Sequence, residues 1–154
     1  MTNLSFTSKN PLSVGKIVNK EDFLKCDLIP QEIKAMIGTK GEFFLMIFVP
    51  REDIIKASFF PCKDAHIEKI LIKLSEFSPE LVKGISEVLK DLKLAEHILH
   101  TTGLCFSTEA CFYESYLHLA PDENIPISSV KEAFLKVPKV LDVIVEELHI
   151  EKTP

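Results

Sequence analysis

Polar and apolar residues alternate most regularly in the stretch "HIEKILIKLSE", residues 66–76. Isoleucine and leucine side chains alternate there with lysine and serine side chains. A period of two places the apolar set on one face of a strand and the polar set on the other. The stretch therefore predicts a β-strand with one buried face and one largely solvated face.

A helical pattern follows this strand directly. Ser78 is a favourable N-cap, Pro79 suits the first helical position, and Glu80 adds negative charge to the first turn. The residues that follow place an apolar stripe along one side of a helix: Leu81, Ile85, Val88, Leu89 and Leu92. A helix that begins at Pro79 is therefore expected.

Four further elements are expected after this helix. The stretches "AEHILHTTGLCF" and "ACFYESYLHLA" predict two strands, joined through residues 107–109 as a tight antiparallel hairpin. A second helix is expected to begin at Ser128 or Ser129, because Ser129 and Glu132 fit a capping box. Pro138 ends this helix, and "VLDVIVEELHI" predicts the last strand.

The N-terminal part of the chain predicts a second group of elements. The stretches "GEFFLMIFVP" and "DIIKASFFP" predict two strands joined by a turn at "PRED". Before them, Pro30 and Gly38 are suited to the start and the stop of a short helix through Ile37. The segment "VGKIV", within the polar first twenty residues, is a candidate edge strand. The hairpin either adds strands to the C-terminal sheet or forms a separate layer.

The predicted order from residue 66 is strand, helix, strand, strand, helix, strand. This order is that of the split βαβ, or ferredoxin-like, arrangement. Two right-handed crossovers then place both helices on one face of a four-stranded antiparallel sheet. The expected fold class is α+β. An N-terminal extension with a short helix and a β-hairpin covers residues 1–62, and a ferredoxin-like domain covers residues 63–154.

The stretch "EFSPELV", residues 76–82, lies at the first strand–helix turn of this arrangement. Pro79 matches the proline of the pattern Asp-Arg-Pro-Gly-Leu-Leu, and Leu81 and Val82 match its apolar pair. This pattern is typical of ACT domains. Glu80 stands where that pattern has glycine. The C-terminal half of the chain thus resembles an ACT domain. The resemblance implies a noncatalytic regulatory module that binds an amino acid or a related small carboxylate and acts as a homodimer.

The ligand-binding site that the resemblance implies is this same turn. Its expected residues come from the end of the strand and the first turn of the helix: Glu76, Phe77, Ser78, Glu80 and Leu81. Free backbone N–H groups and the positive end of the helix dipole there favour an anion or a carboxylate. The expected mechanism is ligand binding at a dimer interface, which shifts the population between two packings.

Composition narrows the classes of partner. The chain has 154 residues and a net charge of −5, and Arg51 is its only arginine. Nucleic-acid sites favour the guanidinium fork, so no nucleic-acid partner is expected. The N-terminus lacks the apolar core of a signal peptide, and the longest apolar run, Phe43 to Pro50, is too short to span a bilayer. A cytoplasmic protein with reduced thiols and no membrane partner is therefore expected.

Histidine and cysteine gather in "HILHTTGLCFSTEAC", residues 97–111. On a strand His97 and His100 face opposite sides, which argues against joint metal ligation, while Cys105 and Cys111 are candidate neighbours across the hairpin. A small enzyme, or a thiol- or metal-binding protein, that uses these residues is the alternative function. No catalytic residue, metal ligand or cofactor is assigned, because the sequence contains no Gly-x-Ser-x-Gly motif, P-loop or Gly-x-Gly-x-x-Gly motif.

The second strand of the hairpin bears apolar side chains on both faces. Phe112 and Tyr116 share one face, and Tyr113 and Leu117 share the other. The set that faces away from the helices is expected to form an apolar patch, and such patches are typical of partner sites. This patch favours the homodimer, unless the N-terminal hairpin and helix cover it within the same chain.

Overall fold

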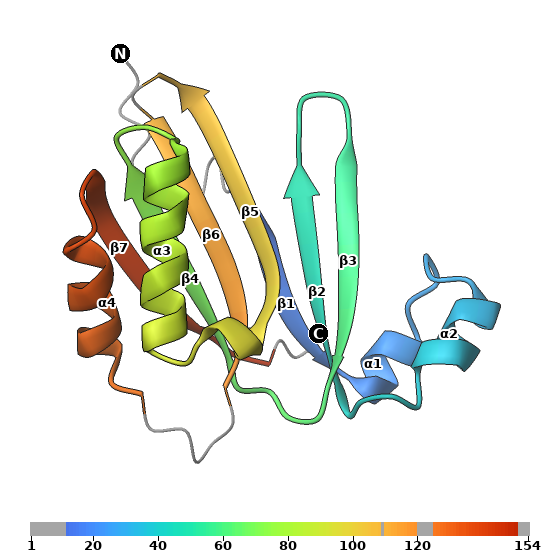
Figure 1. Cartoon of the computed structure of the whole chain (residues 1–154). Helices are drawn as coiled ribbons and strands as arrows, with labels where there is room; N and C mark the ends of the chain where they lie inside the picture. Colours follow the sequence, from blue (N-terminus) through green and yellow to red (C-terminus); the bar gives the residue numbers. More distant parts are fainter. Residues whose placement is uncertain (1–11, 109, 120–124, 151–154) are drawn as a thin grey trace. The chain divides into compact units, whose positions relative to one another are not determined.

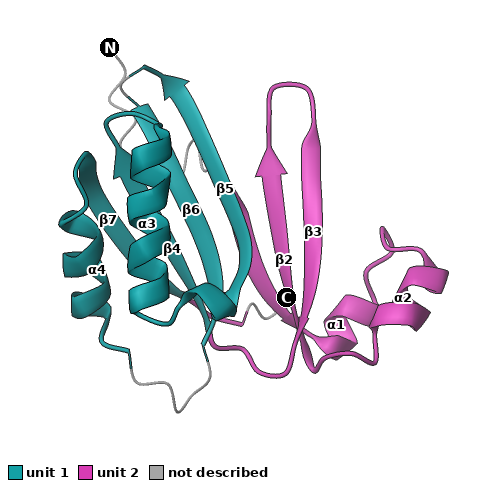
Figure 2. Cartoon of the chain, viewed as in Figure 1, with its two compact units in different colours: residues 1–7, 67–147 teal, residues 8–66, 148–154 magenta. Residues whose placement is uncertain are grey.

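A computed structural model describes residues 12–108, 110–119 and 125–150 of the chain (Figure 1). The described residues divide into two compact units, which Figure 2 colours separately. One unit spans Ile67–Glu147, and the other combines residues 12–66 with residues 148–150. One sheet has three strands and the other has four. The predicted α+β class is confirmed at this level, with two antiparallel sheets and helices beside them.

The three-stranded sheet belongs to the N-terminal unit and has the order β1-β2-β3 (Figure 1). Its strands are β1 (Val14–Asn19), β2 (Phe43–Pro50) and β3 (Ile55–Cys62). Both pairings are antiparallel, and the Arg51 N–H closes the β2–β3 turn by donating to the Ile54 carbonyl at 2.8 Å. The predicted hairpin and the edge strand at "VGKIV" are confirmed. Together they form a sheet of their own.

Two short helices connect β1 to β2. They are α1 (Lys20–Leu24) and α2 (Gln31–Ile37). The predicted helix between Pro30 and Gly38 is confirmed as α2. Sequence reasoning missed α1, although Asn19 is a good N-cap and its side chain accepts a hydrogen bond from the Asp22 N–H at 2.8 Å. In the packing of α1, the Phe23 ring stacks on the Phe44 ring of β2 with 3.9 Å between ring centroids.

The four-stranded sheet belongs to the C-terminal unit and has the order β5-β6-β4-β7. Its strands are β4 (Ile67–Leu74), β5 (Ile98–Ser107), β6 (Ala110–His118) and β7 (Val140–Leu148). The helices are α3 (Pro79–Asp91), α4 (Ile127–Leu135) and the short 3-10 helix η1 (Ala95–His97). Both long helices lie on the same face of this sheet (Figure 1).

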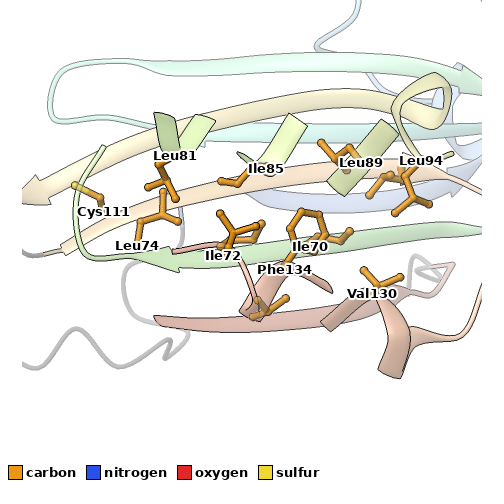
Figure 3. Close-up of a cluster of buried hydrophobic side chains, with 13 residues drawn as sticks. Ile70, Ile72, Leu74, Leu81, Ile85, Leu89, Leu94, Cys111, Val130 and Phe134 are labelled. Carbon is orange, nitrogen blue, oxygen red and sulfur yellow. The ribbon is translucent and has the colours of Figure 1, made fainter. Parts of the chain in front are cut away.

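The core of the C-terminal unit lies between the two helices and the sheet (Figure 3). The stripe of α3 meets the apolar face of β4, and α4 adds Val130 and Phe134. The buried members from α3 and β4 are Leu81, Ile85, Leu89, Ile70, Ile72 and Leu74. Each such side chain contributes roughly 1.5–3 kcal/mol when it leaves water. The period of two in β4 and the helical stripe of α3 are therefore confirmed as the two sides of one core.

The predicted start of the second helix is wrong. α4 begins at Ile127 with Pro126 as its N-cap, and no side chain caps it. Ser129 therefore lies within the first turn, not before it, and forms no capping box. The Pro126 carbonyl accepts from the Val130 N–H at 3.2 Å, so the backbone itself closes the first turn. The helix ends before Pro138, as predicted, because proline cannot continue a helix.

The predicted apolar surface patch on β6 is also wrong. Cys111, Tyr113 and Leu117 belong to the core under the helices, so Phe112 and Tyr116 face away from the helices. Yet Phe112 is only 4% exposed and Tyr116 is 0% exposed. Both side chains are buried within the chain, and the homodimer loses the support that this patch was expected to give.

Candidate functional sites

The strand–helix turn predicted to bind a ligand uses two of its residues for folding. The Ser78 hydroxyl caps α3 by accepting from the Leu81 N–H at 3.3 Å. Leu81 is 3% exposed and belongs to the core. The side chains of Phe77 and Glu80 are exposed, and that of Glu76 is half-exposed. The structure therefore brings these five residues into one turn, in which Leu81 is buried in the core and the Ser78 hydroxyl is engaged in the cap.

An ion pair that the sequence did not predict closes one side of this turn. Lys139, in the loop between α4 and β7, pairs with Glu76, and its carbonyl accepts from the Ser75 N–H at 3.0 Å. The hydrogen bond from Lys139 lowers the pKa of Glu76 below its ordinary value, and the Ser78 hydroxyl adds a smaller effect in the same direction. The two residues are 63 positions apart in the sequence, so only the fold brings them together.

The ring of Phe77 lies against the backbone of β5. A Cβ on Gly103 would stand only 2.7 Å from the Phe77 Cζ atom. Glycine at this strand position thus allows the ring to lie close to the sheet. Phe77 keeps 44% of its surface exposed, so the turn carries an aromatic face that is open to solvent.

The cysteines of the β5–β6 hairpin form a disulfide, Cys105–Cys111. The expectation that they are reduced is therefore wrong. The two residues are direct cross-strand partners with 4.0 Å between their Cα atoms, and this proximity brings the sulfurs within bonding distance. Cys111 is buried, whereas Cys105 is exposed. Cys26 and Cys62 carry free thiols.

The histidines near this hairpin do not join the disulfide. His97 is the last residue of η1. His100 is the cross-strand partner of Tyr116 and lies on the face of the sheet away from the helices, whereas Cys111 lies on the face that the helices cover. The described part of the chain contains no group of three or more histidine, cysteine, aspartate or glutamate residues arranged to hold a metal ion. The feature of this hairpin that the structure shows to be suited to chemistry is its disulfide, Cys105–Cys111.

A buried polar cluster lies on the face of the C-terminal sheet away from the helices. The Lys69 Nζ is 3.1 Å from the Glu114 Oε2 and 5.4 Å from the centroid of the Tyr116 ring. The Glu114 side chain is 1% exposed and that of Lys69 is 14% exposed. On β5, the His100 Nε2 and the Thr102 Oγ1 are 3.0 Å apart. These residues are paired across β4, β6 and β5, so the ladder itself assembles the cluster.

Opposing influences set the charge of this cluster. Burial alone would lower the pKa of Lys69, but the nearby Tyr116 and Glu114 outweigh it, and the pKa is raised. Burial lowers the pKa of His100, against the opposing charge of Glu114. At pH 7 Lys69 is therefore charged and His100 neutral. A cluster in this state is an internal ion pair with hydrogen-bonding neighbours. In the sequence, the feature that could have indicated this cluster is Glu114, which lies between Tyr113 and Tyr116 on a predicted strand.

No known protein-family model matches this chain, and no curated protein sequence matches it. None of the helices in the described residues has the length and apolar character needed to cross a membrane.

Proposed function

We propose that the chain is a noncatalytic regulatory module in which residues 67–147 form a ferredoxin-like, ACT-like domain. The order of the strands carries this proposal. β4 and β5 are joined through α3 and have β6 between them, while β6 and β7 are joined through α4 and have β4 between them. Two interleaved split βαβ units of this kind support a ferredoxin-like arrangement. Because fold does not fix function, the ligand must be tested directly.

The proposed ligand is an amino acid bound at the turn of residues 75–81. The first backbone N–H groups of α3 and its dipole favour the ligand's carboxylate. Glu80, exposed in the first turn, supplies a counter-charge for the ligand's ammonium group. The exposed ring of Phe77 offers an apolar surface for the ligand's side chain. A carboxylate without an ammonium group meets the same Glu80 charge as a repulsion, so the turn favours amino acids over simple carboxylates.

A thermal-shift screen with the full chain tests this function. An amino acid present at about one hundred times its Kd stabilises the folded state by about 2.7 kcal/mol and raises Tm by roughly 5 °C or more. Glu80→Gln is expected to abolish that shift. Glu87→Gln, two turns further along α3 and also exposed, is the matched control and retains it. If no amino acid raises Tm, or if both variants respond alike, the proposed site is wrong.

The disulfide favours a second candidate function, thiol–disulfide exchange with a small-molecule or protein thiol. The incoming thiolate attacks the Sγ of exposed Cys105, a mixed disulfide forms, and the Cys111 thiolate leaves. A second external thiolate then releases Cys105, so two electrons and two protons reach the protein and the external thiols become a disulfide. Alkylation followed by intact mass measurement, in glutathione buffers of graded redox poise, counts the thiols. Exchange predicts a reversible change from two thiols to four in the folded protein, and a bond that is reduced only after unfolding refutes it.

A further inference from the structure

Lys34 is the one buried lysine among the residues that the structure describes. It lies in the middle of α2 and is only 7% exposed. Within the described ranges, its ammonium group has no hydrogen-bond or ion-pair partner. The Nζ atom is not among the fully buried, unpartnered atoms of the described residues, so the stem of Lys34 is buried while its ammonium group reaches solvent. An anionic ligand would give this cation a counter-charge.

Lys34 lines an open groove of about 490 Å³ between α1 and α2. Polar groups come from Lys20, Gln31 and Thr39, and the remaining wall consists of Leu24, Ala35 and Gly38. None of the described residues that line the groove is acidic, so its two lysines have no carboxylate among these neighbours. The volume lies in the range of ordinary small-ligand sites, which are about 300–1,000 Å³.

Gly38 sets the distance between the two walls. A Cβ at this position would stand 2.6 Å from the Lys34 carbonyl oxygen and 2.9 Å from the Leu24 Cδ2 atom. Because glycine has no Cβ, the end of α2 can approach α1 this closely. The groove is therefore built by contacts within the N-terminal unit.

A second groove, which does contain carboxylates, shares Lys20 and Leu24 with the first. That groove contains Glu21 and Glu42 beside Lys63. The Glu21 carboxylate already pairs with the Lys25 Nζ at 3.1 Å. The two grooves thus differ in charge: the second is mixed, and the first is cationic.

We infer that the cationic groove binds a small organic oxyanion, either a carboxylate or a phosphate monoester. The charged head lies between the ammonium groups of Lys20 and Lys34, with the Gln31 amide and the Thr39 hydroxyl as further donors. The apolar body of the ligand rests on Leu24 and Ala35. This site goes beyond the proposed function, because it belongs to the N-terminal unit and shares no residue with the turn of residues 75–81.

Amide-resolved NMR titration of the full chain tests the site. The probes are inorganic phosphate, phenyl phosphate, acetate and benzoate, each at constant ionic strength. Saturable shifts are expected at Lys20 and over Gln31–Thr39, with the aromatic probes binding more tightly than the bare ions. If only the phosphates saturate, the ligand is a phosphate monoester, and if only the carboxylates saturate, it is a carboxylate.

Lysine variants distinguish specific binding in the groove from nonspecific electrostatic attraction of anions. Lys34→Met is expected to weaken binding about tenfold or more, because it removes a charge-assisted hydrogen bond to the ligand. Lys34→Arg keeps the charge and stays within about threefold of the parent. Lys40→Met removes the same charge next to Thr39 without lining the groove, and it leaves the affinity unchanged. If Lys34→Met fails to fold, Lys20→Met makes the same test from the other wall.

Three results would overturn the inference. These are titrations that do not saturate with any probe, equal affinities for Lys34→Met and Lys40→Met, and shifts confined to residues 75–81. The first would mean that water alone solvates the ammonium group of Lys34. Glu80→Gln, which disrupts the turn proposed for amino acids, leaves groove binding unchanged, so failure at one site is distinguishable from failure at the other.

Discussion

At the scale of single residues, the Lys69–Glu114 pair is the buried interaction with the clearest energetic consequence. Glu114→Gln keeps the shape of the side chain but removes the counter-charge of Lys69, whose side chain is 14% exposed. Removing one partner of a buried ion pair costs about 3 kcal/mol or more, because the other charge stays in the interior. Urea unfolding of the variant is therefore expected to show a loss of about that size.

A surface pair is the control for this prediction. Lys83 and Glu87 are 3.9 Å apart with side chains 77% and 63% exposed, so Glu87→Gln should change stability by less than about 0.5 kcal/mol. The raised pKa of Lys69 also determines how the stability contributed by the Lys69–Glu114 pair depends on pH. Its contribution is fully present below the pKa of an unfolded lysine and is lost as pH rises through the folded value. Equal losses for the two glutamate variants would contradict the prediction.

The Glu76–Lys139 pair makes a second prediction at this scale. Because Lys139 lowers the pKa of Glu76, the pair stabilises the fold above the pKa of an unfolded glutamate, and this contribution is lost as pH falls through the folded value. Lys139→Met is expected to return the pKa of Glu76 toward its ordinary value, as measured by side-chain carboxyl NMR. Lys136→Met, at the end of the preceding helix, should leave that pKa unchanged. An unchanged value in Lys139→Met would show that the pair does not form in solution.

At the scale of secondary structure, the sequence predicted elements whose signals are local. The alternation in residues 66–76 and the Ser78–Pro79 start each need only a few neighbouring residues, and both are confirmed as β4 and α3. α1 was missed because five residues are too few to show a helical period. The capping box at Ser129 was wrong because Pro126, three residues earlier, is the N-cap of α4.

The candidate sites were harder to predict because they depend on tertiary pairing. Cys105 and Cys111 were recognised as neighbours, but composition alone gave no reason to expect their oxidation. The partner of Glu76 lies 63 residues away, beyond any local pattern. The burial of Phe112 and Tyr116 follows from the folded chain and not from the alternation in β6, which is the same whether a face is covered or open.

The contact between α3 and the segment that follows α4 gives a prediction at the scale of elements. A Cβ on Gly84 of α3 would stand 2.8 Å from the Cγ1 of Val137. Gly84→Ala gains roughly 1 kcal/mol of helix propensity, but the overpacking against a buried, β-branched side chain costs about 1–3 kcal/mol. Net destabilisation is expected in urea unfolding. In a double-mutant cycle with Val137→Ala, the coupling should be favourable by about 1 kcal/mol, and simple additivity would rule out the clash.

At the scale of the whole molecule, the two units offer different chemistry. The C-terminal unit carries the turn with Glu76, Phe77 and Glu80 and the exposed end of a disulfide, while the N-terminal unit carries a cationic groove around Lys34. A regulatory module needs a ligand-dependent change that another surface transmits. The two proposed sites lie on separate units, so a regulatory role requires that binding at one of them changes the state of a surface elsewhere on the chain.

The proposed homodimer is the prediction that belongs to the whole chain. With Phe112 and Tyr116 buried, the edges of the C-terminal sheet are the better candidates for pairing. β7 carries exposed Asp142, Glu146 and Glu147, and charged residues are a common protection of an edge strand. β5, the opposite edge, has no aspartate, glutamate, lysine or arginine from Ile98 to Ser107.

We therefore expect β5 to pair with its copy in an antiparallel ladder. Light scattering coupled to size-exclusion chromatography should give about twice the chain mass of 17.4 kDa. Thr101→Lys places a charge on an exposed position of β5 and should yield the monomer, because a charged side chain on an edge strand disfavours pairing with a second chain. Leu141→Lys makes an exposed change of the same kind on β7 and should leave the dimer intact. A parent chain that is monomeric at high micromolar concentration would rule out the homodimer. If Leu141→Lys dissociates the dimer and Thr101→Lys does not, the interface lies at β7 and not at β5.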